Sequence, residues 1–401
     1  MARAFDLTEL VAPAALPLHA SVTLEAVTTL EGIDALQPSY ERLLDISANT
    51  LPFALHEWHA TWCRHFLNCN PRVHDEPLFC VLRDASGTCV AVVPLVVSRR
   101  WVGPLRIVSV NLLGADPAVT EVRAPLVQPG YESLTARAVQ DRLMKIGHWD
   151  WVHWTGISED FAAALSVRGT LQWQPALSDY VLDLPPSWEE FRATLKRNIR
   201  ESLRHCYNSL KRDNHRFELK VIEAPGEVRG ALERFLDLHV KRSELRHTII
   251  HPNRFESRVS REFLFEACDR LAQRGILRIF QLEIDSRTVA MRVAFEVRDS
   301  LYLYYSGFDP AWSKYSVMTT TVAEAIKYAI SRGLKTVNLS PTKDVSKMRW
   351  GPRQVDYRAA YELNGRLRSR LARSAYMKAR SGEGLQSWVL QHLIQARRQW
   401  L

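Results

Sequence analysis

A group of polar and basic side chains lies just before one helix in the second half of the sequence. Lys314, Tyr315 and Ser316 precede an apolar pattern, typical of a helix, that runs from about Thr319 to Arg332. The first N–H groups of a helix lack backbone acceptors and carry the positive end of the helix dipole, so they bind phosphate. Lys314 adds a mobile positive charge nearby. We therefore predict an anion site at this helix start.

Two strands flank this helix. Residues 301–305 alternate aromatic and aliphatic side chains, and Ser306-Gly307-Phe308-Asp309-Pro310 ends that strand because glycine and the residue before proline favour turns. Gly333 closes the helix, and residues 336–339 form a second apolar strand. The order strand, loop, helix, strand places the helix start at the mouth of the loop.

Two similar hairpin patterns occur in the two halves of the chain. Residues 79–97 and residues 277–297 each read as apolar strand, polar turn and apolar strand. We interpret them as an internal duplication. The first copy continues into Arg99-Arg100-Trp101 and another strand, so we expect it to lack the loop and helix that hold phosphate.

The order of these patterns predicts four segments. They are a flexible N-terminal tail (1–20), a first module without the anion-binding loop (21–185), a second module with the anion site (186–365) and a basic helical C-terminal tail (366–401). The link between the modules is Pro185-Pro186. In the C-terminal tail, Trp388 and Leu393 belong to a narrow apolar stripe. This stripe suits a packing helix, or a helix that contacts a membrane surface or a partner.

A strongly basic helix opens the second module. Ser187 and Glu190 form a capping box, so a helix begins there, and we expect it to continue to about Arg212. Its arginines and lysines form either a solvated face or a guide for an anionic donor or acceptor.

Composition restricts the class of protein. The chain has 401 residues, is 46% hydrophobic and carries a formal net charge of +9, which favours anionic partners such as a nucleotide, a tRNA or a membrane face. Its six cysteines show no CxxC spacing, which predicts reduced thiols and a cytoplasmic location. We expect no membrane span and no secretory signal. The spacing of His239, His247 and His251 fits no common zinc motif, so we assign no metal.

Four ordered motifs resemble the second acyltransferase module of the GNAT superfamily. They are YYSGFDP at Tyr304–Pro310, WSKYS at Trp312–Ser316, RGL at Arg332–Leu334 and KMRWG at Lys347–Gly351. More narrowly, the pattern is similar to the cellulose-biosynthesis acetyltransferases of CelD/BcsL type, a branch related to the Fem aminoacyltransferases. The resemblance implies an α/β (α+β) fold of two tandem GNAT-like modules, each a mixed twisted sheet flanked by helices.

The same resemblance implies how the acyl donor is held. In GNAT enzymes two parallel strands splay apart, and the pantetheine arm of acyl-CoA pairs with the exposed edge. Here these strands are residues 301–306 and 336–339. The implied residues for acetyl-CoA, or another acyl-CoA, are Ser306, Lys314, Tyr315, Ser316, Val317, Met318, Thr319 and Thr320.

Direct transfer to an amine, as the resemblance implies, requires a deprotonated amine, a stabilised oxyanion and a protonated thiolate. Asp344 is our candidate to orient or deprotonate the amine, and Asn338 stands where the family commonly has an aspartate. Tyr304 or Tyr305 is the candidate to protonate the thiolate, although strand alternation sends one of them into the core.

The closing motif supplies the candidates for binding the acceptor. Lys347 and Arg349 are basic and match the family pattern, so we expect them to hold an anionic acceptor or a donor phosphate. The following Trp350-Gly351 is expected to pack against the end of the sheet.

These observations predict an N-acyltransferase that transfers acetyl from acetyl-CoA to an amine. The acceptor is a sugar, a polysaccharide precursor in exopolysaccharide biosynthesis, or an amino-acid-like compound. One alternative is a Fem-type transferase that uses aminoacyl-tRNA, since the basic helix suits tRNA as well as CoA. Another is a non-catalytic scaffold protein. Asn338 favours it, as does Met318, which stands where the family often has glycine.

Overall fold

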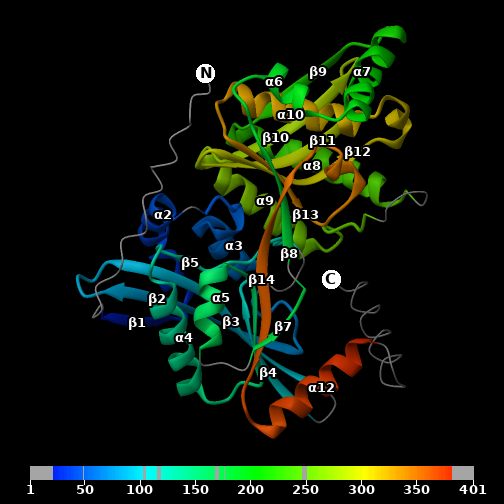
Figure 1. The fold of residues 1–401 in the computed structure, drawn as a ribbon. Coiled ribbons are helices and arrows are strands. Elements are labelled where there is room, and N and C mark those ends of the chain that lie inside the picture. Colours follow the sequence, from blue (N-terminus) through cyan, green and yellow to red (C-terminus); the bar gives the residue numbers. More distant parts are fainter. Residues whose placement is uncertain are drawn as a thin grey trace, which may run out of the picture.

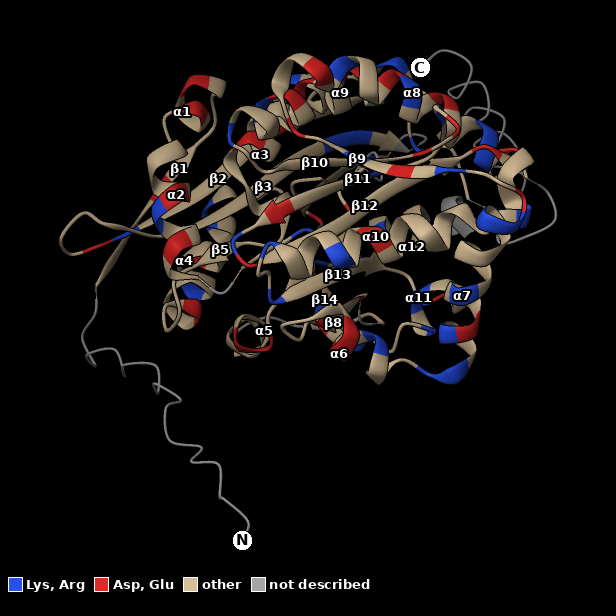
Figure 2. Cartoon of the chain, turned by 90° about the horizontal axis from the view of Figure 1, so that it is seen from above, with Lys and Arg blue, Asp and Glu red and all other residues tan. Residues whose placement is uncertain are grey.

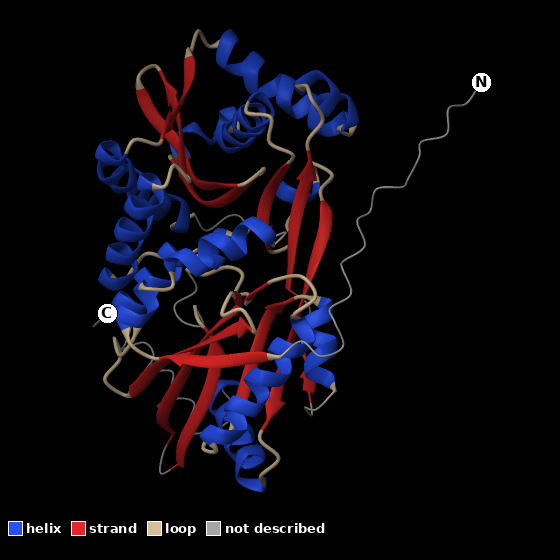
Figure 3. Cartoon of the chain, turned by 90° about the vertical axis from the view of Figure 1, so that its left-hand side faces the viewer, coloured by secondary structure: helices blue, strands red, loops and turns tan. Residues whose placement is uncertain are grey.

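A computed structural model of the chain describes residues 21–381, except 48, 103–104, 115–118, 168–170, 176 and 246–250. Within this part of the chain, strands join into one mixed sheet with the order β1-β2-β3-β4-β6-β14-β8-β13-β12-β11-β10-β9 (Figure 1). Helices cover both faces of the sheet (Figure 3). The expected tail at residues 1–20, His247, and the apolar stripe with Trp388 and Leu393 lie outside the described residues.

The elements of the first half are β1 (Val22–Val27), α1 (Leu30–Asp34), α2 (Gln37–Ile46), η1 (Pro52–Ala54), α3 (His56–Phe66), β2 (Val73–Asp84), β3 (Cys89–Val102), β4 (Leu105–Leu112), β5 (Leu126–Val127), α4 (Glu132–Ile146), β6 (Trp151–Ile157), α5 (Glu159–Ser166), β7 (Leu171–Trp173) and β8 (Leu177–Asp183). The elements of the second half are α6 (Trp188–Thr194), α7 (Arg197–Arg212), β9 (Phe217–Ile222), α8 (Pro225–Ser243), α9 (Arg258–Gln273), β10 (Leu277–Ile284), β11 (Arg287–Val297), β12 (Ser300–Phe308), η2 (Pro310–Tyr315), α10 (Val317–Ser331), β13 (Thr336–Pro341), α11 (Val345–Met348), β14 (Arg353–Leu363) and α12 (Leu367–Ser381).

The internal duplication predicted from the hairpins is confirmed. Each half contains an antiparallel hairpin, β2–β3 or β10–β11, followed by a third antiparallel strand. That strand then pairs in parallel with a later one, β4 with β6 in the first module and β12 with β13 in the second. Both parallel pairs are joined over three residue pairs only.

The first module also contains a crossover helix, and its expected lack of a loop and helix that hold phosphate stays a prediction. Helix α4 lies between β4 and β6, as α10 lies between β12 and β13. What differs is the connection that precedes the helix. In the second module it is the short η2 turn, whereas in the first a longer connection contains β5 and carries Val119 and Glu121, which contact β12 of the other module.

The two modules exchange strands. β8, from the end of the first module, pairs with β13, and β14, from the second module, pairs along its length first with β8 and then with β6. Figure 1 shows β14 running from one module into the other. The sheet is therefore continuous because each module is completed by a strand that the other half of the sequence supplies.

A shared aromatic core joins the modules. The Trp58 ring of α3 lies 5.0 Å from the Phe263 ring of α9, edge to face, and 5.9 Å from the Tyr304 ring of β12. Burial of such rings from both modules removes a large apolar area from water. The two modules thus pack on each other through this core.

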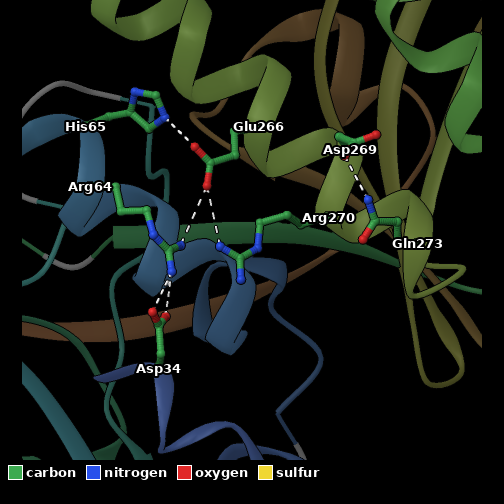
Figure 4. Close-up of polar contacts among 7 residues, drawn as sticks. All are labelled: Asp34, Arg64, His65, Glu266, Asp269, Arg270 and Gln273. Atoms are coloured by element: carbon green, nitrogen blue, oxygen red, sulfur yellow. Dashed lines mark hydrogen bonds and ion pairs between the residues drawn. The ribbon is translucent and has the colours of Figure 1, made fainter. Parts of the chain in front are cut away.

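Ion pairs surround this core at the surface (Figure 4). Arg64 of α3 binds Asp34 at 2.6 Å and Glu266 of α9 at 3.6 Å, and His65 approaches Glu266 at 2.8 Å. Arg270 also contacts Glu266, at 3.4 Å. These ion pairs link α3 of the first module to α9 of the second. Because their groups are partly exposed, they contribute little to the free energy of unfolding.

The basic segment forms two helices rather than the single one we expected. α6 ends at Thr194, whose hydroxyl donates to the Phe191 carbonyl at 2.8 Å, and Leu195 and Lys196 are extended. The break lets Leu195 turn into the core, where it is 4% exposed. The capping box at Ser187 is present, with the Glu190 N–H donating to the Ser187 hydroxyl at 3.2 Å.

Gly307 allows α8 to approach β12 closely. A Cβ at this position would lie 2.4 Å from the backbone nitrogen of His239. Gly307→Ala is therefore expected to destabilise the protein by about 1–3 kcal/mol, because it pushes the backbones apart. Gly226→Ala, near the start of the same helix and with nothing within 4 Å of its new Cβ, should be neutral or slightly stabilising. Urea unfolding measures both, and equal effects would contradict this account.

Candidate functional site

The strands β12 and β13 separate near their midpoints. Their parallel pairing covers Ser300 with Thr336, Leu301 with Val337 and Tyr302 with Asn338, and the described structure shows no further pair between them. Each strand nevertheless continues, β12 to Phe308 and β13 to Pro341. The predicted splayed pair is therefore present, and it leaves an open edge on β12 beyond Tyr302.

A carboxylate from the first module lies at this point of separation. The Tyr302 hydroxyl donates to Oε2 of Glu121 at 2.9 Å, and the Tyr304 hydroxyl donates to the Val119 carbonyl at 2.5 Å. The Trp58 indole N–H donates to Thr120 Oγ1 at 3.0 Å and holds the same connection. Burial raises the pKa of Glu121 to about 7, although the nearby Lys347 charge opposes the shift. A carboxyl group with this pKa can exchange protons near neutral pH.

The amide of Asn338 is committed to neighbouring groups at the separation point. Its Nδ2 donates to Asp179 Oδ2 of β8 at 2.8 Å, and its Oδ1 accepts the Ser340 N–H at 2.8 Å. Burial raises the pKa of Asp179, and Tyr357 also donates to this carboxylate at 3.3 Å. Asn338 therefore positions a buried carboxylate that comes from the exchanged strand.

The end of β13 has an unusual backbone that Lys347 holds. Ser340 has a φ of 67° and Thr342 a φ of 78°, a region that non-glycine residues, and β-branched ones above all, adopt at an energetic cost. Lys347 Nζ donates to the Ser340 hydroxyl at 3.1 Å and to the Pro341 carbonyl. Burial lowers the pKa of Lys347, and the Glu121 charge opposes this. Lys347 thus binds the strained turn, and its positive charge also interacts with the carboxylate of Glu121.

Ser306, predicted to contact the cofactor, is instead enclosed by arginines. Its hydroxyl accepts Arg242 at 2.6 Å and Arg292 at 3.3 Å, and its side chain is fully buried. Burial lowers the pKa of both guanidinium groups to about 10, so both stay charged at neutral pH. Arg242 also donates to His251 Nε2 at 2.9 Å, and burial, followed by this charge, lowers the pKa of His251 to about 4. The neutral His251 therefore acts as an acceptor here.

A bulge in β12 alters the predicted roles of Tyr304 and Tyr305. The register against β11 passes from Leu303 opposite Ala294 to Ser306 opposite Arg292, so β12 has one extra residue. The two rings, which alternation would send to opposite faces, lie 4.4 Å apart, and both contact Phe255. Tyr304 is 3% exposed and its hydroxyl is bound to Val119. Of the pair, Tyr305 is the more exposed.

Asp344 caps the short helix α11. Its Oδ1 accepts the Lys347 N–H at 3.0 Å and the Ser346 hydroxyl at 2.5 Å. Burial raises the pKa of Asp344, but the Ser346 bond and the Lys347 charge outweigh this and lower the pKa overall. This carboxylate is therefore ionised and suits anchoring an amine better than accepting a proton.

Asp344→Asn is expected to lower turnover more than donor affinity, because the variant loses the charge that is our candidate for anchoring the acceptor amine. Asparagine caps helices about as well as aspartate, so stability should change by less than about 0.5 kcal/mol. Steady-state kinetics and CoA titration on the same preparations measure the two effects. A variant that binds CoA more weakly but turns over normally would place Asp344 on the donor side.

The η2 turn before α10 is anchored by Tyr315. Its hydroxyl donates to Asp213 Oδ2 at 2.9 Å and is hydrogen-bonded to His215 Nε2 at 2.9 Å. His215 Nδ1 lies 2.6 Å from Asp285 Oδ2, so a chain of side chains fixes the turn. Lys314 has a 69% exposed side chain and lies 3.7 Å from Asp213. Tyr315 thus holds the turn in place, and the exposed side chain of Lys314 adds a positive charge beside the start of α10.

The start of α10 has fewer free N–H groups than we expected. The Thr319 and Thr320 N–H groups donate to the Ser316 carbonyl at 2.8 and 3.3 Å, so in the described structure Val317 and Met318 are left without a backbone acceptor. Ser316 itself has a φ of 52°, which turns the chain into the helix. The side chains of Val317 and Thr320 are buried, so these residues can offer only backbone groups to a ligand.

Arg349 lies beside the start of α10, where the donor is expected to bind. Of its two predicted roles, this position favours binding a donor phosphate over binding the acceptor. Its Nη2 donates to Thr319 Oγ1 at 2.5 Å. Burial lowers the pKa of its guanidinium. A guanidinium beside two free N–H groups and a helix dipole is a suitable phosphate site. The sequence motif located Arg349 but did not indicate which substrate it faces.

Between the modules lies a cavity of about 450 Å³. Both halves of the chain contribute to its wall, which includes Asn49, Glu132, Ser300, Asn338, Arg353 and Tyr357. The cavity is therefore a cleft shared by the two modules. It lies on the face of the parallel strands that carries Tyr302 and Asn338, as expected for an acceptor site.

The exposed face of α7 is strongly basic (Figure 2). Together with Trp188 and Tyr207, its side chains line a shallow surface hollow that includes Arg192, Arg197, Arg200 and Arg204. Among the described residues no group of His, Cys, Asp and Glu suits a metal ion. Likewise, none of the described helices has the length and apolar character required to cross a membrane.

Sequence reasoning missed Glu121, Asp179, Arg242 and Arg292. None of them belongs to a motif of the second module's closing segment, and two come from the first half of the chain. A single buried charged residue has no periodic signature, whether it lies in a connection, a strand or, like Arg242, a helix, so only the fold could reveal these four.

Comparison with known proteins places these features in context. Residues 197–348 match the sequence profile of the family described as "Acetyltransferase (GNAT) domain". No protein of curated function matches the chain. The fold is similar to that of FemX, with 11% identity, a TM-score of 0.57, and 87% of this chain and 100% of that chain covered.

Two further solved structures are similar at lower scores. A conserved protein of unknown function from Bacteroides thetaiotaomicron is 13% identical, with a TM-score of 0.48, covering 86% of this chain and 100% of that chain. The C-terminal domain of a putative lysylphosphatidylglycerol synthetase from Agrobacterium fabrum is 13% identical, with a TM-score of 0.48, covering 85% and 96%. The chain is an acyltransferase with a mixed α/β fold, and its residues 197–348 are similar to a GNAT acetyltransferase domain.

Proposed function

We propose that the protein is an N-acyltransferase that takes an acetyl group from acetyl-CoA and transfers it to an amine. The observation that carries this proposal is the position of Glu121. Its carboxylate reaches from the first module to the point where β12 and β13 separate, 2.9 Å from the Tyr302 hydroxyl. A base at this point faces the place where the GNAT fold presents a thioester.

The donor is held at the start of α10 in this proposal. The diphosphate of CoA accepts the N–H groups of Val317 and Met318 and the guanidinium of Arg349, which already touches Thr319. Lys314 adds long-range attraction. The pantetheine arm follows the open edge of β12, and its thioester ends near Tyr302.

Glu121 removes a proton from the acceptor amine, whose nitrogen attacks the thioester carbon. The C–N bond forms, the C–S bond breaks, and the leaving thiolate takes a proton, for which Tyr305 is our candidate. Nε of Arg292 is buried and has no acceptor within the described chain, so it can donate to the oxyanion. Lys347 and Asn338 position the strand end, and Asp344 anchors the ammonium form of the amine.

The acceptor enters through the cavity between the modules. Its wall combines apolar strand residues with Asn49, Glu132 and Arg353, a mixture of donors and acceptors that suits a hydroxylated amine such as an amino sugar. We assign the protein to exopolysaccharide biosynthesis of the CelD/BcsL type, and to the cytoplasm, on the resemblance of its motifs.

One experiment tests the proposal directly. The full chain is incubated with acetyl-CoA and a panel of amino sugars, amino-sugar oligosaccharides and amino acids, while free thiol and the N-acetylated product are followed by absorbance and mass spectrometry. We expect thiol release that depends on one class of amine. A protein that binds acetyl-CoA and acetylates nothing would support a scaffold role instead.

A second candidate is transfer from aminoacyl-tRNA, as in Fem-type enzymes. Two observations favour it: the fold shared with FemX, and the basic face of α7 with Arg197, Arg200 and Arg204. Binding of tRNA that falls steeply with salt and competes with CoA would support this candidate. Tight CoA binding with no tRNA binding would exclude it.

A further inference from the structure

The first module has a cavity of its own, of about 420 Å³. Ser109, Asn111, Trp151 and His153, from its parallel strand pair, line this cavity. Asn111 pairs with His153 as Tyr302 pairs with Asn338 in the second module. The cavity therefore occupies, in the first module, the face that borders the acceptor cleft in the second.

Aromatic side chains form much of the wall of this cavity. Trp62 and Phe66 come from α3, and Trp151, Tyr361 and Tyr376 come from β6, β14 and α12. The rings of His153 and Tyr361 are stacked, with centroids 4.3 Å apart and planes inclined by 10°. Because His153 and Arg373 cover the two faces of the Tyr361 ring, Tyr361 offers its edge, and Trp62 and Trp151 supply the apolar surface that suits a planar ligand.

Buried donors face the same space without acceptors. Trp62 is 4% exposed, and its indole N–H has no hydrogen-bond partner within the described residues. The same is true of Nε of Arg100, another wall residue. A buried donor without an acceptor costs free energy, which a ligand acceptor would recover.

The charge of the wall is positive. Arg100 and Arg123 both line the cavity, and Asp75 is the carboxylate of the described wall. Asp75 accepts the Ser98 hydroxyl at 2.6 Å, and the two arginines outnumber this single carboxylate. Donors and positive charge together select a ligand rich in acceptors and negatively charged.

We propose that this cavity is a second ligand site, which binds a small organic anion: a planar ring that carries a carboxylate or a phosphate. The ring lies among Trp62, Trp151 and Tyr361, and the anionic group accepts from Arg100 and the Trp62 N–H. The site belongs to the first module and is independent of the transfer reaction proposed above. Its volume falls in the range of small-molecule pockets.

The test titrates the full chain with benzoate and phenyl phosphate, with benzyl alcohol as an uncharged ring and inorganic phosphate as an anion without a ring. Tryptophan fluorescence reports binding, because Trp62 and Trp151 line the cavity. Arg100→Met should weaken the better aromatic anion about tenfold to a hundredfold, as expected for the loss of a charge-assisted hydrogen bond. Trp62→Phe, which keeps a ring and removes the N–H, should weaken it about twofold to tenfold.

Two matched variants locate the binding. Arg106→Met removes an exposed arginine of β4 outside the cavity and should leave the affinity unchanged. Arg349→Met removes the contact with Thr319 at the start of α10 and should also leave the affinity for the aromatic anion unchanged. Saturable binding that is weakened only in the Arg100 and Trp62 variants supports the site. Binding that is lost in Arg349→Met instead, benzyl alcohol binding as tightly as benzoate, or no saturable binding of either aromatic anion would overturn it.

Discussion

Replacing Glu121 by glutamine is expected to lower kcat by about 10²–10⁴-fold, the usual contribution of a general base. Glutamine keeps the shape of the side chain and can still accept the Tyr302 hydroxyl, which now donates at 2.9 Å. It cannot take a proton from the acceptor amine. CoA affinity should stay within about twofold, because Glu121 lies away from the α10 start. Steady-state kinetics with saturating acetyl-CoA measure the loss.

The pH profile identifies the mechanism behind that loss. Burial raises the pKa of Glu121 to about 7, so the activity of the native protein should rise with pH through about 7 and then level off. The variant should lack this limb. Tyr302→Phe removes a hydrogen bond that lowers the pKa of Glu121, so its limb should move to higher pH. A limb that persists in Glu121→Gln would assign the base to another residue.

Glu121→Gln should also be more stable than the native protein in alkaline solution. A carboxyl pKa raised from 4.5 to about 7 means that the folded state binds a proton more tightly than the unfolded state. The free energy of unfolding therefore falls as the pH rises from about 4.5 to about 7. Glutamine removes this penalty, which amounts to about 1–3 kcal/mol above pH 7. Higher stability together with lower turnover would show that Glu121 serves the reaction at a cost in stability. A purely structural residue would lose both when replaced.

Replacing Arg349 by methionine is expected to weaken CoA binding by about tenfold to a hundredfold. The guanidinium is partly buried beside the α10 start, where its Nη2 donates to Thr319 at 2.5 Å. A charge-assisted hydrogen bond in such a place contributes roughly 1.5–3 kcal/mol, and each 1.4 kcal/mol is about tenfold in affinity. Methionine keeps the apolar part of the side chain that packs near Trp350. Calorimetric titration with CoA and with desphospho-pantetheine measures the effect.

Lys314→Met is the matched control on the same loop. This lysine is 69% exposed and lies 3.7 Å from Asp213, so solvent and salt screen its charge. Its loss should weaken CoA by no more than about fivefold, and added salt should remove most of the difference. Desphospho-pantetheine should bind both variants equally. Equal losses for Lys314→Met and Arg349→Met would show that the site responds to net charge and not to a specific contact.

Local patterns in the sequence were enough to locate several elements. The hairpin at 277–297 is present with Asp285 and Ser286 in positive φ at its turn. The strand, loop, helix and strand around residues 301–339 were likewise predicted. Such features depend on side-chain periodicity and turn chemistry within about fifteen residues, which a single sequence displays directly.

The duplication was also visible in the sequence, but its exchange of strands was not. β8 and β14 cross between the modules, and no pattern in the sequence indicated this exchange. Pairing between distant strands depends on register and on which edges remain open, and neither quantity is written in a local pattern. The equivalence of α4 to α10 was missed for a related reason, because the long connection before α4 hid it.

The site itself was decided by tertiary structure. The sequence located the anion-binding helix start and the residues of the closing motif, because those groups are neighbours along the chain. It could not show that Arg349 turns to the donor helix, that Asn338 holds Asp179, or that Glu121 crosses from the first module. Charged groups gathered from distant segments acquire their chemistry from shared burial, since a low dielectric shifts pKa values only after the chain has folded around them.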